Sequence, residues 1–484
     1  MCDNGRRDGA ACPVMLSRRE FLGTMGAVGA GAMAVRMGLL DVAASALGAE
    51  AGGGKKPVVR AAFLRPRAEK YWMGWPGAAY DIGGHEKEYT AVLRQAAERE
   101  GVALEFAPEA LWDEGAVGTF LEGLKAKPPD GVILTIMDMS RWGDVNAFLE
   151  KRGALPTVVF SPMGTSFTGH LGPTAHAKHA FVAATQDAGW LGTGVKLHKV
   201  MSRMRELRIC IASGDKTENK TLEVLGTTLR YVPRSRFPED LAKVQESEEA
   251  KAVAAYYTKE ARQIVEPSGA DILNAAENYL ACRRLMASEG CEAISMDCLG
   301  LVGSRQIPCP PCIGFSRLLD EGLGGVCEAD VGAGISLMLA SYLCGRPGFM
   351  QDPAPNTVNN TLMGAHCTCP TKLDGFDKPH EPFRLRSHSE SDIGVSPQVL
   401  WRLGQKVTLM KFEGPGTMLI GTGRVRSNID TPPSGGCRTS VELEVDDVAD
   451  TRNVKGFHQV FLYGEWAELL KAYCQLAGVN AVAM

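Results

Sequence analysis

The chain has 484 residues, more than one hydrophobic core usually accommodates, so we expect two or three domains. Its composition, 45% hydrophobic and 22% charged, is that of an ordinary globular protein. The formal net charge of -4 gives no electrostatic footprint for nucleic acid or for an anionic membrane, and we expect neither as a partner of the mature chain.

The N-terminus predicts an export signal. Arg18 and Arg19 precede a weakly apolar stretch rich in Gly and Ala, and small-residue cleavage sites follow it. The pattern is similar to a twin-arginine signal peptide at residues 1–49, followed by a linker at 50–56. A membrane anchor is the alternative, but its many glycines and Arg36 make the stretch a poor transmembrane span. We therefore expect a periplasmic or otherwise exported protein, and such substrates often carry a cofactor.

Residues 57–200 predict an N-terminal α/β domain. Short β-branched runs alternate here with helical patterns. Strands are expected at 57–64, 130–137 and 156–162, and helices at 85–101 and 142–153. Because strands that alternate with helices form parallel sheets, we expect a Rossmann-like layer arrangement.

Residues 201–325 predict a second domain of the same kind. Strands are expected at 206–214 and 292–299, a long helix at 272–290, and surface helices in the highly charged stretch 236–262. The expected fold class of this part is again a Rossmann-like parallel α/β domain.

Residues 326–484 change in style and predict an α+β domain with an antiparallel β-barrel. An apolar helix is expected at 328–344, strands at 405–414, 416–425, 438–447 and 458–466, and a helix at the end of the chain. In the stretch 438–447, Val441, Leu443 and Val445 alternate with glutamates, which is typical of a half-buried antiparallel strand.

Four metal-competent side chains lie beside apolar sequence in this last part. Glu328 begins the apolar helix, Asp352 ends a short strand where the chain is expected to turn at Pro353, His366 follows an Asn-rich loop, and His458 begins a late strand. Each has an ordinary structural explanation when taken alone, as a helix-terminal charge, a turn former or a buried histidine. Together, two carboxylates and imidazoles are suitable ligands for Mn²⁺, Mg²⁺ or a similar divalent ion.

The order of these residues resembles the L-fucose isomerase family, whose overall build L-arabinose isomerase shares. The resemblance rests on "CEAD" before an apolar helix, a strand ending in Asp352, "HC" after an Asn-containing loop, and the late "GFHQVFLYGEW". It covers residues 295–475 best. It implies an aldose–ketose isomerase in which Glu328, Asp352 and His458 hold a divalent metal, commonly Mn²⁺. Glu328 and Asp352 would then pass a proton between C1 and C2 of a sugar through an enediol.

Further residues are candidates for contact with the substrate. They share a polar or aromatic side chain: His366, Asn356, His388 and Arg384 in the last part of the chain, and Trp75 in the loop after the first predicted strand. The resemblance places His366 either on the sugar or on the metal as a fourth contact. In the segment 383–394, polar side chains, among them Arg384 and His388, occupy every second position. We expect this segment either to line a pocket or to form a solvated edge. Aromatic rings stack on sugars, so Trp75 is a candidate, with packing within its loop as the alternative. The expected partners are a small-molecule sugar and, by resemblance, further copies of this chain in a trimer or hexamer.

Three features depart from the family pattern. Ala365 stands where fucose-type enzymes tend to carry an aromatic residue, and the chain is shorter than typical members of the family. The chain also carries an export signal, whereas sugar isomerases of central catabolism are cytoplasmic. Two other functions therefore stay open beside isomerisation. One is a non-catalytic sugar-binding protein of the same fold, and the other is a metal-dependent sugar epimerase or lyase.

Overall fold

The computed structural model describes residues 55–484 except for 69, 73–78, 175, 415 and 431–436. The predicted signal at 1–49, most of the linker at 50–56 and the candidate Trp75 lie outside the described residues. Within the described part, no helix is both long enough and apolar enough to cross a membrane.

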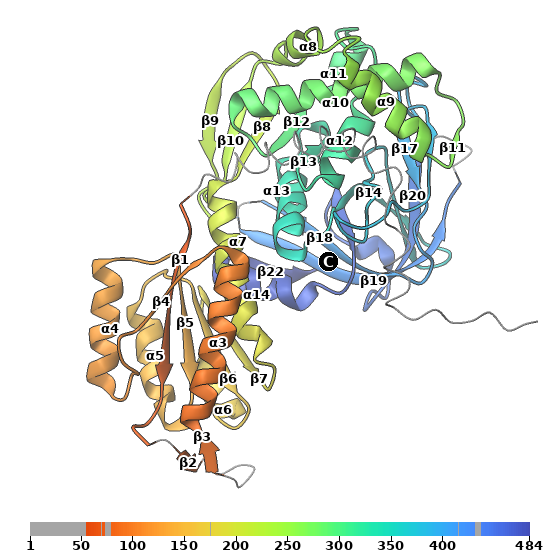
Figure 1. Ribbon diagram of the computed structural model, residues 1–484. Coiled ribbons are helices and arrows are strands. Elements are labelled where there is room, and N and C mark those ends of the chain that lie inside the picture. Colours follow the sequence, from red (N-terminus) through yellow and green to blue (C-terminus); the bar gives the residue numbers. More distant parts are fainter. Residues whose placement is uncertain (1–54, 69, 73–78, 175, 415, 431–436) are drawn as a thin grey trace, which may run out of the picture. The chain divides into compact units, whose positions relative to one another are not determined.

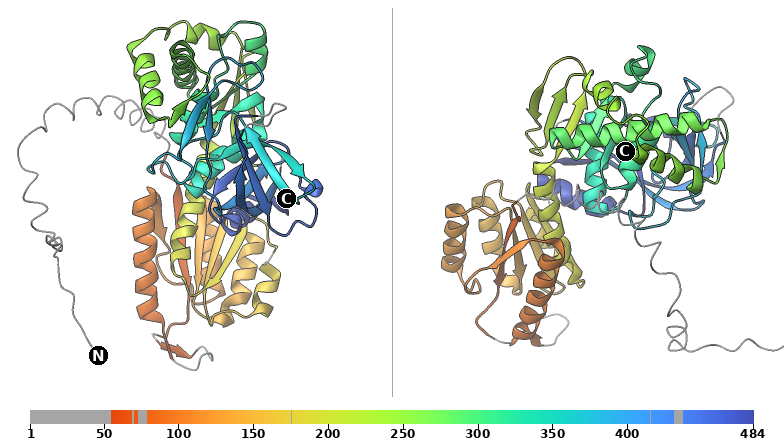
Figure 2. Two further views of the ribbon diagram at one scale, coloured as in Figure 1. Left: turned by 90° about the vertical axis from the view of Figure 1, so that its right-hand side faces the viewer. Right: turned by 45° about the horizontal axis from the view of Figure 1, so that its top comes forward.

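The first sheet is parallel throughout and is covered on both faces. Its order is β4 (Ala103–Phe106), β1 (Val58–Leu64), β5 (Gly131–Ile136), β6 (Thr157–Pro162) and β7 (Ala180–Thr185). Helices α3 (Ile82–Glu100) and α7 (Gly189–Glu206) cover one face, and α4 (Glu114–Ala126) and α5 (Trp142–Lys151) cover the other, as Figures 1 and 2 show. Along β1, Ala61 packs on the first pair and Ala62 on the second. The strands and helices predicted here are confirmed to within a few residues.

The second sheet is parallel except for one edge strand. Its order is β13 (Gly324–Val326), β12 (Ala293–Met296), β8 (Arg208–Ala212), β10 (Thr228–Val232) and β9 (Glu218–Thr221), with β9 antiparallel to β10. The long helix α10 (Gly269–Glu289) packs against α8 (Arg236–Leu241), α9 (Glu248–Glu260) and α12 (Cys312–Asp320). It begins three residues before the predicted start because Ser268 and Asp271 form a capping box.

Gly325 of β13 allows α12 to lie directly against this sheet. A Cβ atom at Gly325 would lie 2.5 Å from the Cα atom of Phe315, a backbone contact that cannot be relieved by a side-chain rotation. Gly325→Ala is therefore expected to lower the free energy of unfolding by about 3 kcal/mol, the upper end for overpacking. Gly118→Ala is the matched control, because this exposed helical glycine has nothing within 4 Å of the added carbon. It should raise the free energy of unfolding by about 0.4–1 kcal/mol in the same urea titration.

The last part of the chain forms a closed antiparallel barrel of six strands. Their order is β18 (Lys406–Phe412), β21 (Gln459–Tyr463), β14 (Phe349–Asn356), β15 (Thr361–His366), β20 (Thr439–Val445) and β19 (Thr417–Asn428), and pairing of β18 with β19 closes the ring. The predicted C-terminal helix is α14 (Ala467–Ala477), and the chain then adds β22 (Asn480–Ala483) parallel to β19. The mixed α/β class with an antiparallel barrel is therefore confirmed.

Smaller elements complete the described chain. A three-stranded sheet contains β11 (Gln263–Ile264), β16 (Phe383–Arg386) and β17 (Ser396–Val399). The remaining short elements are β2 (Lys70–Trp72), β3 (Ala79–Asp81), α6 (Thr168–Leu171) and α11 (Cys298–Gly303), with single turns η1 (Met139–Arg141), η2 (Gly172–Thr174) and η5 (Thr451–Asn453).

The helix predicted at 328–344 begins later than expected. Glu328 lies in a 3₁₀ turn, η3 (Cys327–Ala329), and the α-helix α13 runs only over Val331–Leu339 before a π-helical turn, η4 (Ala340–Cys344). The prediction fails because Glu328 and Ala329 both have φ of 55°, which is left-handed and incompatible with an α-helix. Regular helix starts only where the Asp330 side chain accepts a hydrogen bond from the Ala333 N–H.

The prediction that the chain turns at Pro353 is also wrong. Strand β14 continues through Pro353 to Asn356, and the turn comes at 357–360. On one side β14 pairs with β21 only as far as Gln351, so no ladder partner there requires an N–H from residue 353. Proline is tolerated where one side of a strand is free. Asp352 is consequently fixed within a strand instead of in a turn.

One further strand prediction needs correction. The outer face of β20 is not solvated at Glu442, because this carboxylate is 8% exposed and accepts hydrogen bonds from Thr361, Ser427 and Asn356. The alternating segment 383–394 is a strand only as far as Arg386, and the rest is a loop.

Candidate metal centre

Three neighbouring barrel strands bring together the carboxylate and the two histidines predicted from sequence. Asp352 on β14 pairs with Ala365 on β15, and His366 is the last residue of β15. On the other side of β14, the pairing of Gln351 with Gln459 places His458 opposite Asp352 when the register is extended by one residue.

Glu328 reaches the same point from the parallel sheet. It follows β13, so it lies at the carboxyl end of a parallel strand, the edge where α/β sheets usually carry their sites. Its carboxylate oxygens are 3.5 Å from His458 Nε2 and 4.0 Å from His366 Nε2. The predicted set of Glu328, Asp352, His366 and His458 therefore converges in the folded chain.

The cluster has a buried floor and an open rim. The two imidazole side chains are only 4% and 5% exposed, whereas the Glu328 and Asp352 side chains are 42% and 39% exposed. A fully enclosed structural metal site would bury all of its ligands. This arrangement leaves the two carboxylates accessible to a small molecule.

The donor set fits a divalent cation. Ligand atoms of Asp352, His366 and His458 lie within 4.8 Å of one another, so this group, in which both histidines are buried, could hold a metal ion. Asp352 Oδ1 and His458 Nε2 are buried 3.1 Å apart, yet neither has a hydrogen-bond partner among the described residues. Buried polar atoms are rarely left unsatisfied in this way. Two carboxylates and two imidazole nitrogens match the ligand chemistry of Mn²⁺ or a related ion.

Asp330 and Lys411 support the cluster and were not predicted. Asp330 Oδ2 is 2.9 Å from His458 Nδ1, and the Lys411 ammonium donates to both Asp330 oxygens at 2.9 and 2.8 Å. A carboxylate on the outer nitrogen fixes the ring and leaves the other nitrogen for a ligand. Two sequence signals could have identified this pair: an Asp directly before an apolar helix, and Lys411 among the apolar residues of β18, whose other lysine, Lys406, is the exposed first residue of the strand.

The carboxylates around His458 favour a positive charge at its ring. Burial by itself lowers the pKa of His458, but its hydrogen bond to Asp330 and the negative charges of Asp330 and Asp352 raise that pKa to about 9. For Asp330, burial opposes ionisation, whereas its bonds to His458, Lys411 and the Ala333 N–H hold the carboxyl pKa well below its ordinary value. The Asp330 charge is thus matched by Lys411, and the charges of Glu328 and Asp352 are left to balance a cation.

Asp330→Asn is expected to weaken Mn²⁺ binding by about 10- to 100-fold, the usual effect of removing a carboxylate behind a ligating histidine. Asparagine still caps α13, so that helix should persist. The change leaves Lys411 buried without its ion pair, and a second variant separates the two effects. Asp330→Asn/Lys411→Met should recover the free energy of unfolding but not the Mn²⁺ affinity, as measured by urea titration and by electron paramagnetic resonance. Affinity equal to that of the unaltered protein in both variants would contradict the supporting role.

The backbone is strained at the cluster. Glu328, Ala329 and His458 have φ of 55°, 55° and 51°, in the left-handed region that non-glycine residues seldom adopt. Such conformations persist only where surrounding structure enforces them, and they concentrate at functional sites.

The other predicted contact residues lie outside this cluster. Asn356 donates to Glu442 Oε1 at 3.1 Å and accepts from the Asn359 N–H. His388 is buried, shares a hydrogen bond of 2.9 Å with Ser391, and contacts Cys367, the residue after His366. It therefore contacts the residue next to His366 but is not among the described groups that could hold a metal.

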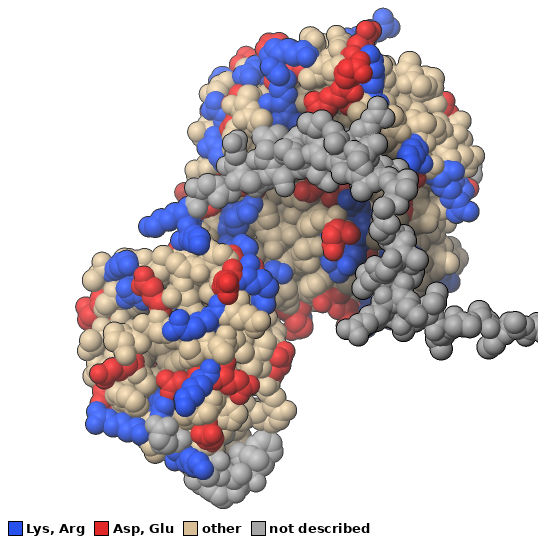
Figure 3. Space-filling view, viewed as in Figure 1, with Lys and Arg blue, Asp and Glu red and all other residues tan. Residues whose placement is uncertain are grey.

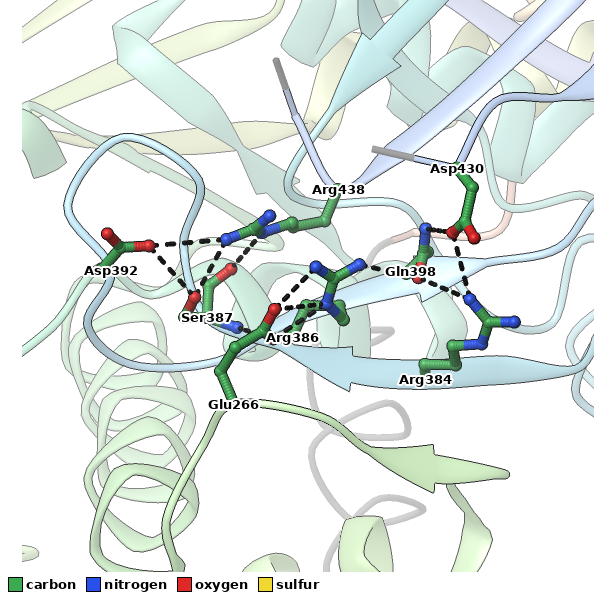
Figure 4. A network of polar contacts seen from close by, with 8 residues as sticks. All are labelled: Glu266, Arg384, Arg386, Ser387, Asp392, Gln398, Asp430 and Arg438. Atoms are coloured by element: carbon green, nitrogen blue, oxygen red, sulfur yellow. Dashed lines mark hydrogen bonds and ion pairs between the residues drawn. The ribbon is translucent and has the colours of Figure 1, made fainter. Parts of the chain in front are cut away.

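Arg384 belongs to a polar network on β16, which Figure 4 shows. Its guanidinium pairs with Asp430 at 3.1 Å and with Gln398, while Arg386 forms an ion pair with Glu266. In the same network Arg438 donates to the Ser387 carbonyl at 2.8 Å, which fixes the start of the loop that carries His388. These contacts give Arg384 a structural partner instead of a place at the ligand atoms.

Charged side chains of both signs are interspersed on the face seen in Figure 3.

No protein-family model matches the sequence, and a search of curated proteins finds no match either.

Proposed function

We propose that this chain is an exported, metal-dependent carbohydrate isomerase that interconverts an aldose and a ketose, as its resemblance to L-fucose and L-arabinose isomerases implies. The observation that carries the proposal is the convergence of Glu328, Asp352 and His458, from two separate sheets, on one accessible point. We propose Mn²⁺ or another divalent ion as the cofactor, held by these three residues with His366 as a further ligand.

A bound divalent ion would supply polarisation of the sugar carbonyl, which stabilises the negative charge that develops when a neighbouring C–H proton is removed. The protein's own groups handle the proton. The carboxylates of Glu328 and Asp352 both lie near His458 Nε2, at 3.5 and 3.1 Å, and both are solvent-accessible. C1 and C2 of an aldose are bonded to each other, so two carboxylates in one small volume can serve both atoms. One accepts the proton as a base, and the other acts as an acid at oxygen.

The proposal includes the organisation expected from sequence. It comprises an N-terminal α/β domain at 57–200, a second at 201–325 and a metal-binding domain at 326–484, with export by the twin-arginine route. A trimer or hexamer is part of the same resemblance. A sugar-binding protein would need accessible polar groups but not two carboxylates converging on one histidine nitrogen, which favours the enzyme.

The test is incubation of the Mn²⁺-loaded full chain with a panel of aldoses in D₂O, followed by NMR. Isomerisation predicts a ketose with deuterium at C1. Conversion to another aldose, or loss of water, would instead establish an epimerase or a lyase. Sugar binding without any conversion by the metal-loaded protein would contradict the proposal and favour the non-catalytic function.

A further inference from the structure

A second set of possible ligands overlaps the proposed centre. Cys327 Sγ, a Glu328 carboxylate oxygen and a His366 ring nitrogen all lie within 4.8 Å of one another. The set of Asp352, His366 and His458 satisfies the same criterion. His366 is common to both sets, but Cys327 belongs to only one of them, and it supplies the only sulfur in either.

The left-handed turn explains how two consecutive residues serve one ion. In an extended chain, successive side chains point to opposite sides. At Glu328 the φ of 55° and the 3₁₀ turn break this alternation directly after β13. The Cys327 thiol and the Glu328 carboxylate can therefore face the same point. Cys327 is 5% exposed and His366 is 3% exposed, so two of the three ligand atoms lie in a buried environment.

The shared histidine makes the two sets mutually exclusive. His366 Nδ1 shares a hydrogen bond of 3.2 Å with Thr368 Oγ1, which leaves Nε2, 4.0 Å from Glu328 Oε1, for an ion. One ring nitrogen has one lone pair and binds one ion. Occupation of one set therefore removes His366 from the other.

The chemistry of the two sets differs. Thiolate with imidazole and carboxylate favours Zn²⁺, Co²⁺ or Cd²⁺, whereas carboxylate with imidazole also suits Mn²⁺. We propose that Cys327, Glu328 and His366 bind a thiophilic divalent ion that competes with the ion of the proposed centre, which uses Glu328 and His366 as well as Asp352 and His458. Binding replaces the thiol proton, which passes to solvent, and no electron is transferred. The inference rests on the metal-binding part of the proposed function and adds a position selective for softer ions.

Cobalt is a direct probe, because a cobalt–thiolate bond gives a near-ultraviolet charge-transfer band that oxygen and nitrogen ligands do not give. The metal-free full chain would be titrated with Co²⁺. We expect the band in the unaltered protein and in Asp352→Asn/His458→Gln, and its loss in Cys327→Ser. Cys344→Ser is the matched control, because this buried thiol belongs to neither set and the band should persist. Circular dichroism would verify folding, with Cys327→Ala as a second variant.

Competition supplies a second readout. Zn²⁺ should displace Mn²⁺ from the protein, and electron paramagnetic resonance measures the Mn²⁺ that is released. Cys327→Ser should raise the Zn²⁺ concentration that displaces half of the Mn²⁺ by at least about tenfold. Co²⁺ binding without the band, or a band that persists in Cys327→Ser, would overturn the inference even if Mn²⁺ binding and isomerisation are found. Loss of isomerisation alone, with the band intact, would count against the proposed function and not against this site.

Discussion

Glu328→Gln is expected to lower turnover by about 10²- to 10⁴-fold, the range that a general acid or base contributes. Glutamine has nearly the same shape, but its amide can neither accept a proton from carbon nor carry the charge that a divalent ion requires. The Glu328 side chain is 42% exposed, so the substitution should leave the free energy of unfolding nearly unchanged. The measurement is the rate of ketose formation at saturating aldose, beside a urea titration of each protein.

Glu444→Gln is the matched control for this change. Glu444 is an exposed glutamate on β20 and is not among the groups that could hold a metal. Its substitution should change neither rate nor stability. Turnover that survives in Glu328→Gln at the level of this control would remove Glu328 from the mechanism.

Asp352→Asn/His458→Gln is expected to weaken Mn²⁺ binding by more than about 100-fold, since loss of ligating atoms should exceed the effect of losing a supporting residue. Both changes act at the pair of atoms 3.1 Å apart that lack hydrogen-bond partners. The double variant should still fold, because Asp330 loses its bond to His458 but keeps its ion pair with Lys411 at 2.8 Å. Mn²⁺ affinity is measured by electron paramagnetic resonance.

Asp447→Asn/His176→Gln makes the same two chemical changes at exposed positions. Its Mn²⁺ affinity should equal that of the unaltered protein. Equal affinities in the two double variants would show that the ion, if bound, lies elsewhere.

The regular elements were predictable because their patterns follow from burial. Fully buried strands such as β5 and β6 appear as continuous apolar runs, and covered parallel strands require such runs. Strand β22 is not predictable from the sequence, because it has only four residues and its exposed Ala and Val side chains show no alternation of apolar with polar residues. The closure of the barrel by β18 and β19 depends on pairing between strands, which single-sequence periodicity does not encode.

The centre was predictable in its residue types and only partly in its geometry. Glu328, Asp352, His366 and His458 do meet in the folded chain. Their local context was wrong in two places, since Glu328 lies in a left-handed turn and Asp352 lies within a strand. Helical propensity of the apolar run and the turn preference of Pro are weak priors. The left-handed backbone at Glu328 overrides the first, and the pairing of β14 with β15 overrides the second.

The supporting residues could not be assigned from sequence alone. The position of Asp330 before an apolar run predicts a helix cap, and Asp330 does cap α13. It also orients His458, a residue 128 positions later in the sequence. The alternation of Arg384 with other polar residues does not indicate its partners, which are Asp430 and Gln398, and its contact with a substrate stays a prediction. Long-range partners of this kind depend on which strands become neighbours.

Elemental analysis of the purified full chain tests the central claim most directly, beside the variant Glu328→Ala/Asp352→Ala. We predict a stoichiometric divalent metal in the unaltered protein and its loss in the variant. A folded, metal-free protein that cannot be loaded with Mn²⁺ would contradict a metal centre at Glu328, Asp352 and His458, and with it the proposed isomerase.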